Sequence, residues 1–121
     1  MLATGYAMST DCLFCKIANG DIPAELVAED DDLVAFNDIS PQAPVHLLII
    51  PKKHLATVND LTEADADIVS KLILCAKALA SENGISESGY RLLFNCNAQG
   101  GQTVYHLHLH LLGGRQLGAL G

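Results

Sequence analysis

Apolar stretches separated by turn residues predict three strands in the first half of the chain. ELVAEDDDLVAFND holds two apolar stretches on either side of Asp30–Asp32, which indicates a hairpin with an acidic turn. The loop ISPQAP, with two prolines in six residues, leads into VHLLIIP, which begins at Val45 and ends at Pro51. Because this run is almost entirely apolar, it predicts a central strand buried on both faces.

Two helices are expected, one short and one long. The short helix follows Cys12 and ends at Asn19–Gly20, because Asn and Gly commonly close helices and Pro23 blocks continuation. The long helix begins near a Thr62 N-cap and ends at Asn83–Gly84, a length of roughly twenty residues. Its apolar positions recur at helical spacing: Ile68, Leu72, Cys75, Ala76 and Leu79.

The last two expected strands are GYRLLFNCN and TVYHLHLHLL, separated by the glycine-containing turn AQGGQ. The order of short helix, hairpin, strand, long helix and two strands predicts an α+β fold with a mostly antiparallel five-stranded sheet. Met8 lies just before the first predicted helix. We therefore interpret residues 1–7 as a leader or tag-like segment and residues 8–121 as one domain.

Composition and charge narrow the classes of partner. Half of the 121 residues are apolar, which is enough for a real core, and seven basic against fourteen acidic residues give a net charge of −7. Such a chain is not expected to bind nucleic acid or anionic membranes through a broad basic surface. No apolar run approaches the ~20 residues that span a bilayer, and no secretory signal is recognised, so we expect a cytoplasmic protein.

Three histidines at every second position are the most informative feature of the chain. On a strand, His106, His108 and His110 would project to one face about 6.6 Å apart, with the intervening leucines on the other face. They could be a solvated polar face, a zinc site, or a catalytic group with an imidazole nucleophile. The preceding GGQT favours phosphorus chemistry, because small residues let backbone N–H groups approach an anion.

Two cysteines near the start of the chain form a second candidate site. Cys12 and Cys15 are two residues apart, which supplies half of a tetrahedral zinc site. A thioredoxin-like redox pair is an alternative, but it expects a βαβ context that this stretch lacks. Two unrelated buried cysteines are the remaining alternative.

The stretch QTVYHLHLHLLGGR resembles the signature of the histidine triad (HIT) superfamily, in its nucleotide-binding Hint branch. The similarity includes FNDISPQAPVHLLIIPKKH and covers residues from about Cys12 to Arg115. It implies a single-domain HIT fold and a homodimer. It also implies hydrolysis of purine nucleoside phosphoramidates, conjugates of AMP or GMP, through a covalent nucleotidyl-histidine intermediate and without a catalytic metal.

Two other functions stay open at this point. One is a nucleotide-binding interaction protein whose hydrolysis is incidental, which predicts tight binding of a nucleoside monophosphate with very slow turnover. The other is a metallohydrolase in which all three triad histidines hold zinc, which predicts that chelation abolishes activity.

The resemblance also implies roles for individual side chains. His108 would attack the α-phosphorus, His110 would donate to a non-bridging phosphate oxygen, and His46 would support the triad. Thr103 and Gln102 would contact the phosphate and the leaving group. The remaining nucleotide contacts are Asp38 for the ribose hydroxyls, Asn95 near the sugar-phosphate, the backbone N–H of Gly101, and an apolar slot for the base formed by Leu13, Phe14, Ile17, Phe36 and Ile39.

The chain resembles the zinc-containing, bacterial-type members of the family, and this resemblance implies two further ligands for a zinc site that includes Cys12 and Cys15. In those proteins the histidine after PKK, here His54, and the first triad histidine, here His106, join the two cysteines in a structural Cys2His2 zinc site. Such a site would hold the N-terminal segment against the sheet and fix the orientation of His106.

Overall fold

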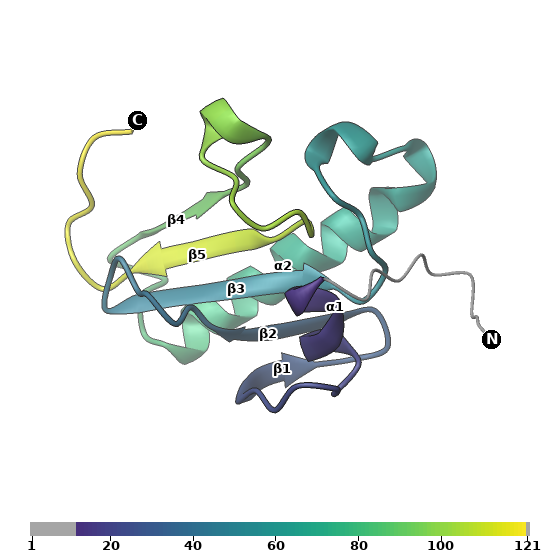
Figure 1. Cartoon of the computed structure of the whole chain (residues 1–121). Coiled ribbons are helices and arrows are strands. Elements are labelled where there is room, and N and C mark those ends of the chain that lie inside the picture. Colours follow the sequence, from purple (N-terminus) through teal and green to yellow (C-terminus); the bar gives the residue numbers. More distant parts are fainter. Residues whose placement is uncertain (1–11, 121) are drawn as a thin grey trace.

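The computed structural model describes residues 12–120 (Figure 1). The expected leader at residues 1–7 and the start of the expected domain at residue 8 lie outside the described residues. The elements are α1 Leu13–Ala18, β1 Leu26–Glu29, β2 Leu33–Asn37, β3 Val45–Pro51, α2 Ala66–Glu82, β4 Tyr90–Leu93 and β5 Leu109–Gly113, with short 3₁₀ turns at Val58–Asp60, Glu63–Asp65 and Ala98–Gly100. No helix within residues 12–120 has the length and apolar content to cross a membrane.

The five strands form one sheet in the order β1-β2-β3-β5-β4, and every neighbouring pair is antiparallel. The predicted α+β fold, with a five-stranded antiparallel sheet and one long and one short helix, is confirmed. β3 lies at the centre of the sheet, and six of its seven residues are buried. The expectation of a central strand from VHLLIIP is therefore correct.

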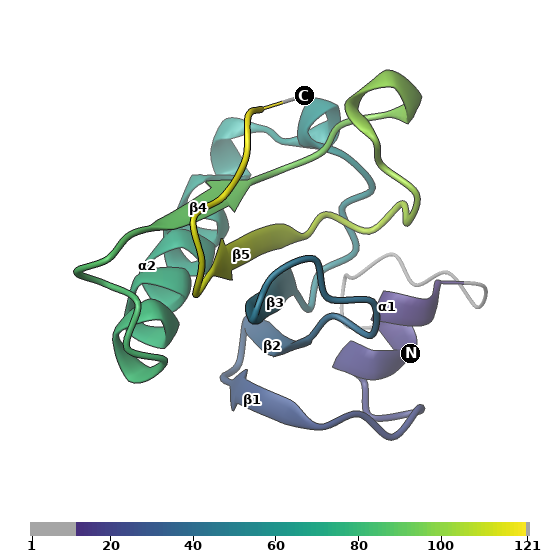
Figure 2. The same cartoon turned by 90° about the vertical axis from the view of Figure 1, so that its left-hand side faces the viewer.

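The two helices cover opposite faces of the sheet (Figure 2). Because side chains alternate along a strand, β3 divides its apolar residues between two cores. Leu47 and Ile49 pack in the larger core with Leu72 of α2, whereas Leu48 and Ile50 pack in the smaller core with Phe14 of α1. The functional residues described below lie on the α1 side, at the edge of the smaller core.

The long helix is shorter than predicted because its first turn is not α-helical. Thr62 caps the 3₁₀ turn Glu63–Asp65, and α2 begins at Ala66. Asp65 is buried, accepts from the Thr62 N–H at 3.0 Å and accepts from the Lys53 ammonium at 2.8 Å. The hydrogen bond from Lys53 lowers the pKa of the Asp65 carboxyl. This contact ties the segment that carries His54 to the start of α2.

The last two strands are also shorter than predicted, and this changes the description of the histidines. β5 begins at Leu109, so His106 and His108 precede the strand instead of lying within it. β4 pairs with β5 only as far as Leu93 opposite His110, and beyond this pair the two segments separate. The alternation nevertheless persists: Leu107, Leu109 and Leu111 pack in the larger core, while His106 and His108 lie on the opposite side against Phe14.

Candidate active site and metal centre

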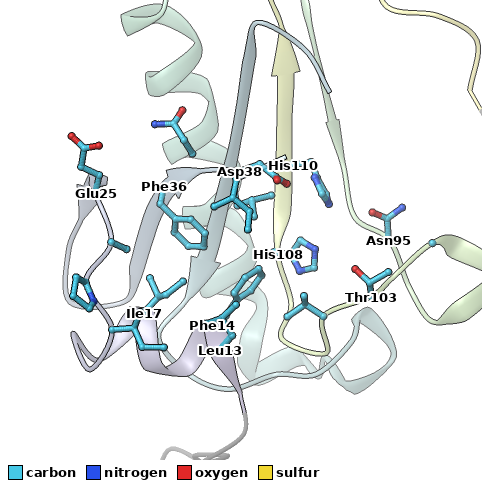
Figure 3. Close-up of a pocket in the computed structure, with 18 residues that line it drawn as sticks. Leu13, Phe14, Ile17, Glu25, Phe36, Asp38, Asn95, Thr103, His108 and His110 are labelled. Atoms are coloured by element: carbon cyan, nitrogen blue, oxygen red, sulfur yellow. The ribbon is translucent and has the colours of Figure 1, made fainter. Parts of the chain in front are cut away.

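A cavity of about 620 Å³ opens between α1, the end of β2 and the segment before β5 (Figure 3). Its volume lies within the range of small-molecule sites, ~300–1,000 Å³. It is lined by eleven of the residues predicted from the sequence: Leu13, Phe14, Ile17, Phe36, Asp38, Ile39, Asn95, Gly101, Thr103, His108 and His110. In Figure 3, His108 lies between the apolar group around Phe14 and the polar side chains of Thr103 and Asn95.

The sequence reasoning missed part of the cavity wall. The connection between α1 and β1, residues 22–25, lines the cavity, as do Asn37, Leu48 and Val104. Residues 22–25 follow the predicted end of the short helix, but neither their spacing nor their composition indicates a ligand contact. Only the closeness of α1 to β2 in the fold brings this connection to the cavity.

Hydrogen bonds fix which nitrogen of His108 carries the proton. Its Nδ1 lies 2.7 Å from the backbone carbonyl oxygen of His106. A carbonyl only accepts, so Nδ1 is the N–H donor, and in the neutral ring Nε2 keeps its lone pair. The ring is buried and packs edge-on against Phe14, with 5.2 Å between centroids. In the neutral ring, the nitrogen that carries the lone pair therefore belongs to a side chain that lines the cavity.

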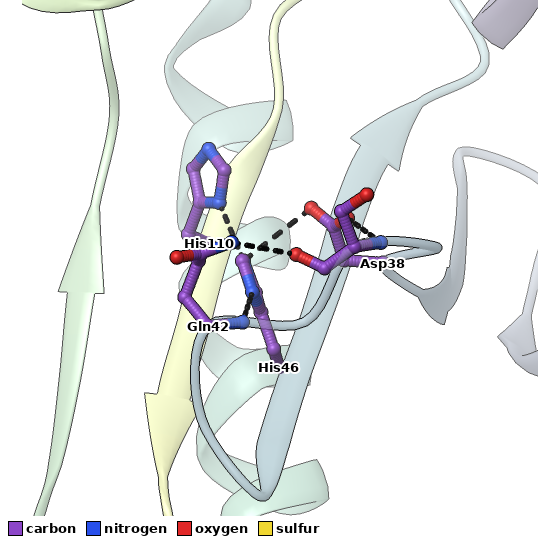
Figure 4. Close-up of polar contacts among 5 residues, drawn as sticks. Asp38, Gln42, His46 and His110 are labelled. Carbon is purple, nitrogen blue, oxygen red and sulfur yellow. Dashed lines mark hydrogen bonds and ion pairs between the residues drawn. The ribbon is translucent and has the colours of Figure 1, made fainter.

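Hydrogen bonds also fix the proton positions of His46 and His110 (Figure 4). The Gln42 backbone N–H donates to His46 Nδ1 at 3.0 Å, so the proton of neutral His46 is on Nε2. His46 Nε2 lies 2.9 Å from His110 Nδ1 and therefore donates to it. It follows that the proton of neutral His110 is on Nε2. Asp38 adds a carboxylate oxygen 3.5 Å from His46 Nε2.

His110 Nε2 carries a buried N–H that has no acceptor within residues 12–120. It is the one buried side-chain nitrogen or oxygen within residues 12–120 without a hydrogen-bond partner. Leaving a buried donor unpaired costs about 1–3 kcal/mol, which an anionic oxygen in the cavity would recover. The His108 and His110 ring centroids are 4.9 Å apart. A nucleophilic lone pair and an available N–H thus lie on neighbouring rings at the same cavity.

Asp38, His46 and His110 also have ligand atoms within 4.8 Å of one another, the spacing of a metal site. A metal there would require a lone pair on His46 Nε2. The N–H of Gln42 already occupies the lone pair of His46 Nδ1 and places the proton on Nε2. The geometry therefore favours a hydrogen-bonded chain of three side chains over metal ligation.

Burial keeps the rings of His46 and His110 neutral at pH 7. It lowers the pKa of His110 to about 4, with further lowering by His108 and His46 and an opposing effect of Asp38. Burial also lowers the pKa of His46, and the Asp38 carboxylate partly offsets this. Neutral rings at pH 7 agree with the proton positions assigned from the hydrogen bonds.

We expect the free energy of unfolding to decrease as the pH falls from about 6.5 to about 4. The pKa of His110 in the folded protein, about 4, is below its ordinary value of 6.5, so the unfolded chain binds this proton more readily. The contribution is fully present above pH 6.5 and is lost as the pH falls through about 4. Urea unfolding of the wild type and His110→Gln across this range measures it. Equal pH dependence in the two proteins would contradict the assignment.

Two of the predicted nucleotide-binding residues stabilise the loop beside the cavity. Gln102 is buried and does not line the cavity. Its Oε1 accepts from the Asn97 N–H at 2.8 Å, and its Nε2 donates to the carbonyl oxygens of Ala56 and Val104 at 2.8 and 3.0 Å. Asn95 lines the cavity and donates to the Gly100 carbonyl at 2.6 Å. His46 lies behind the cavity wall instead of lining it.

The four predicted metal ligands converge beside this site. Cys12, Cys15, His54 and His106 have their Sγ and Nδ1 atoms within 4.8 Å of one another. Contacts of 3.1–3.4 Å join Cys15 to His54, Cys12 and Cys15 to His106, and His54 to His106. Tetrahedral zinc with Zn–N of ~2.0 Å and Zn–S of ~2.3 Å separates its ligand atoms by about 3.3–3.8 Å. The spacing and donor set fit such an ion.

The protonation of His106 suits this use. Its Nε2 donates to the Pro51 carbonyl at 2.8 Å, which leaves the lone pair on Nδ1 facing the cysteines. Burial lowers the pKa of His106 to about 4, so the ring is neutral, as a metal ligand must be. A carbonyl that holds the second nitrogen of a ligating histidine is the usual outer-shell contact of such sites.

Comparison with known proteins agrees with this geometry. The HIT domain family model matches residues 19–117. The purine nucleoside phosphoramidase of Escherichia coli K12 is 48% identical, over 93% of this chain and 95% of the relative. A HIT family hydrolase from Legionella pneumophila is 61% identical with a TM-score of 0.86, over 88% of this chain and 95% of its own. A histidine triad protein from Clostridium difficile is 44% identical with a TM-score of 0.90, over 95% and 100%.

The predicted resemblance is therefore confirmed. The matched region runs from the end of α1 past β5 and includes the triad histidines, His46 and His54. This chain belongs to the HIT family.

Proposed function

We propose that this protein hydrolyses purine nucleoside phosphoramidates through a covalent nucleotidyl intermediate on His108. One observation carries the proposal: the lone pair of His108 Nε2 and the unpartnered N–H of His110 lie on adjacent rings at one cavity. The 48% identity to a purine nucleoside phosphoramidase supports the substrate class.

In the first step, His108 Nε2 attacks the α-phosphorus and a P–N(imidazole) bond forms. The bond between phosphorus and the leaving amine breaks, and its electron pair goes to the amine nitrogen. The amine takes up a proton that solvent supplies through the hydroxyl of Thr103, which lines the cavity. His110 Nε2–H donates to a non-bridging oxygen as negative charge increases there.

In the second step, water attacks the phosphorus of the nucleotidyl-His108 intermediate. The water loses a proton to solvent through the Thr103 hydroxyl, the P–N(imidazole) bond breaks with its electron pair returning to Nε2, and the nucleoside monophosphate leaves. Imidazole suits both steps because the neutral ring is a nucleophile near pH 7 and a good leaving group from phosphorus. The His108 Nδ1–H stays on the His106 carbonyl throughout, so the ring is presented in one orientation.

The chemistry of the cavity wall indicates where the base and the ribose of the nucleotide would bind. The apolar side chains of Phe14, Ile17 and Phe36 suit the faces of a purine. The Asp38 carboxylate has one oxygen engaged by the Ser40 N–H at 2.8 Å, and its acceptor capacity suits the ribose hydroxyls. Gly101 has a positive φ of 87° and brings its backbone close to the cavity.

The metal at the Cys2His2 cluster would be a structural zinc ion. When bound, it would supply cross-linking of α1 to the segment before β5, and it would take no part in the reaction. This assignment makes hydrolysis independent of a catalytic metal.

We also place the protein in the cytoplasm as a homodimer. The dimer would form through α2 and an outer strand of the sheet, where β4 has one unpaired edge and Ile73 is exposed on the helix. Sedimentation equilibrium decides the oligomeric state, and a monomer at micromolar concentration would remove the dimer from the proposal.

The deciding experiment is hydrolysis of adenosine and guanosine 5′-monophosphoramidate, with AMP binding measured in parallel. We expect turnover of both purine substrates that persists in the presence of a chelator. Tight AMP binding with negligible turnover would favour a nucleotide-binding interaction protein. Immediate loss of activity on chelation, with the fold intact, would favour a metallohydrolase.

A further inference from the structure

The GGR sequence, residues 113–115, begins with the last residue of β5 and has no role in the reaction described above. Its arginine nevertheless contacts the residue that donates to His46. Arg115 Nη2 donates to the backbone carbonyl of Gln42 at 2.7 Å, and its Nη1 donates to the Gln116 carbonyl at 2.9 Å. The N–H of Gln42 is the donor to His46 Nδ1. Gln42 thus accepts a hydrogen bond from Arg115 at its carbonyl and donates one from its N–H to His46.

The glycines before Arg115 make this contact sterically accessible. Gly114 has a φ of +93°, and a Cβ there would lie 2.9 Å from Pro44 Cβ. Any larger residue would push the chain away from the loop that contains Gln42. Gly113 is similarly close-packed, since a Cβ would lie 2.7 Å from Ile85 Cδ1. The two glycines let the chain turn against Pro44 and direct Arg115 to the Gln42 carbonyl.

A continuous series of hydrogen bonds therefore runs from the surface to the cavity. It passes from Arg115 to the Gln42 carbonyl at 2.7 Å. It continues from the Gln42 N–H to His46 at 3.0 Å and from His46 to His110 at 2.9 Å (Figure 4). It ends at the unpartnered Nε2–H of His110. If the Gln42 N–H moved away, His46 Nδ1 would lose its donor, and neither nitrogen of His46 would be fixed as the protonated one.

We propose that Arg115 is a positioning residue that holds the Gln42 loop so that its N–H selects the Nε2–H form of His46 and keeps the proton of His110 aimed into the cavity. The inference rests on the proposed hydrolase function for its kinetic consequence, but its structural core is the proton position on two rings. Arg115 itself does not line the cavity.

Arg91 is a matched control. It is also an arginine that donates through Nη2 to a backbone carbonyl, that of Gly118, at 2.8 Å. Its replacement removes the same charge and the same kind of contact from the same end of the molecule, without a link to His46. We compare Arg115→Ala, Arg115→Lys and Arg91→Ala.

The first readout is independent of activity. Long-range ¹⁵N–¹H spectra of histidine-labelled protein report which ring nitrogen carries the proton. We expect the wild type and Arg91→Ala to show single Nε2–H forms for His46 and His110, and Arg115→Ala to show averaged signals for both rings. Unchanged signals in a folded Arg115→Ala protein would overturn the proposal whether or not the protein hydrolyses phosphoramidates.

The second readout is kinetic. We expect Arg115→Ala to lower kcat on adenosine 5′-monophosphoramidate about tenfold with little change in KM, because the group lost acts as charge develops in the transition state. Arg115→Lys, which keeps a donor for the Gln42 carbonyl, should recover most of kcat. In a His46→Ala background, Arg115→Ala should cost less than about twofold. A full tenfold cost in that background, or an equal loss in Arg91→Ala, would overturn the proposed route.

Discussion

Replacing His108 by alanine is expected to lower kcat on adenosine 5′-monophosphoramidate by at least about 10³-fold. The substitution removes the imidazole lone pair that the hydrogen bonds present to the cavity, that of Nε2. Within residues 12–120 no second imidazole lone pair faces the cavity, since His110 presents an N–H and His46 does not line it. Steady-state assays that follow release of AMP measure the effect.

Binding should change much less than turnover. The apolar wall around Phe14 and Phe36 and the N–H of His110 remain in His108→Ala, so the Kd for AMP should stay within about tenfold of wild type. The matched variant His110→Ala removes one transition-state donor and should lower kcat by about 10²–10³-fold. Protein denatured at alkaline pH, where a P–N(imidazole) bond survives, should carry a nucleotidyl adduct on His108 in the wild type. An adduct elsewhere, or more than a tenth of wild-type kcat in His108→Ala, would refute the assigned nucleophile.

The sequence predicted eleven of the residues that line the cavity and the four that form the Cys/His cluster. The alternation of histidine and leucine separates core from site wherever the backbone is extended, so it held for residues 106–108 although these precede β5. It did not show where strand pairing ends, because this depends on β4 separating from β5 beyond Leu93. A chain extended enough to alternate side chains is not necessarily paired with a neighbour.

The sequence did not predict which ring nitrogens carry protons, because backbone groups set them, both near in the chain, as for His108 and His46, and distant, as for His106 and Pro51. His106, His108 and His46 each have one nitrogen fixed by a carbonyl or an N–H, and His110 is then fixed by His46. Such contacts leave no signature in residue type. Gln102 shows the same limit, because its predicted substrate contact competes with three hydrogen bonds to the backbone of its own and a neighbouring loop.

Replacing Cys12 by serine is expected to lower the melting temperature of the zinc-loaded protein by about 10–15 °C. Cys12 is buried and its Sγ lies 3.3 Å from His106 Nδ1, so its loss opens a four-ligand set. An ion bound at a thousand times its Kd contributes about 4 kcal/mol, and 1 kcal/mol corresponds to ~2–8 °C in a domain of this size. Calorimetry of zinc-loaded and chelator-treated protein, with metal content from mass spectrometry, measures the effect.

The control is Cys96→Ser, a substitution at a half-buried cysteine outside the cluster, which should shift the melting temperature by only a few degrees. A chelator should lower the wild type to the value of Cys12→Ser and leave the variant unchanged. At 25 °C, kcat of Cys12→Ser should stay within tenfold of wild type. His108 takes its orientation from the backbone carbonyl of His106 and from Phe14, and neither contact uses the metal-facing nitrogen of His106. A wild type insensitive to chelation, or a variant that loses turnover with unchanged stability, would show that the cluster is not a structural metal site.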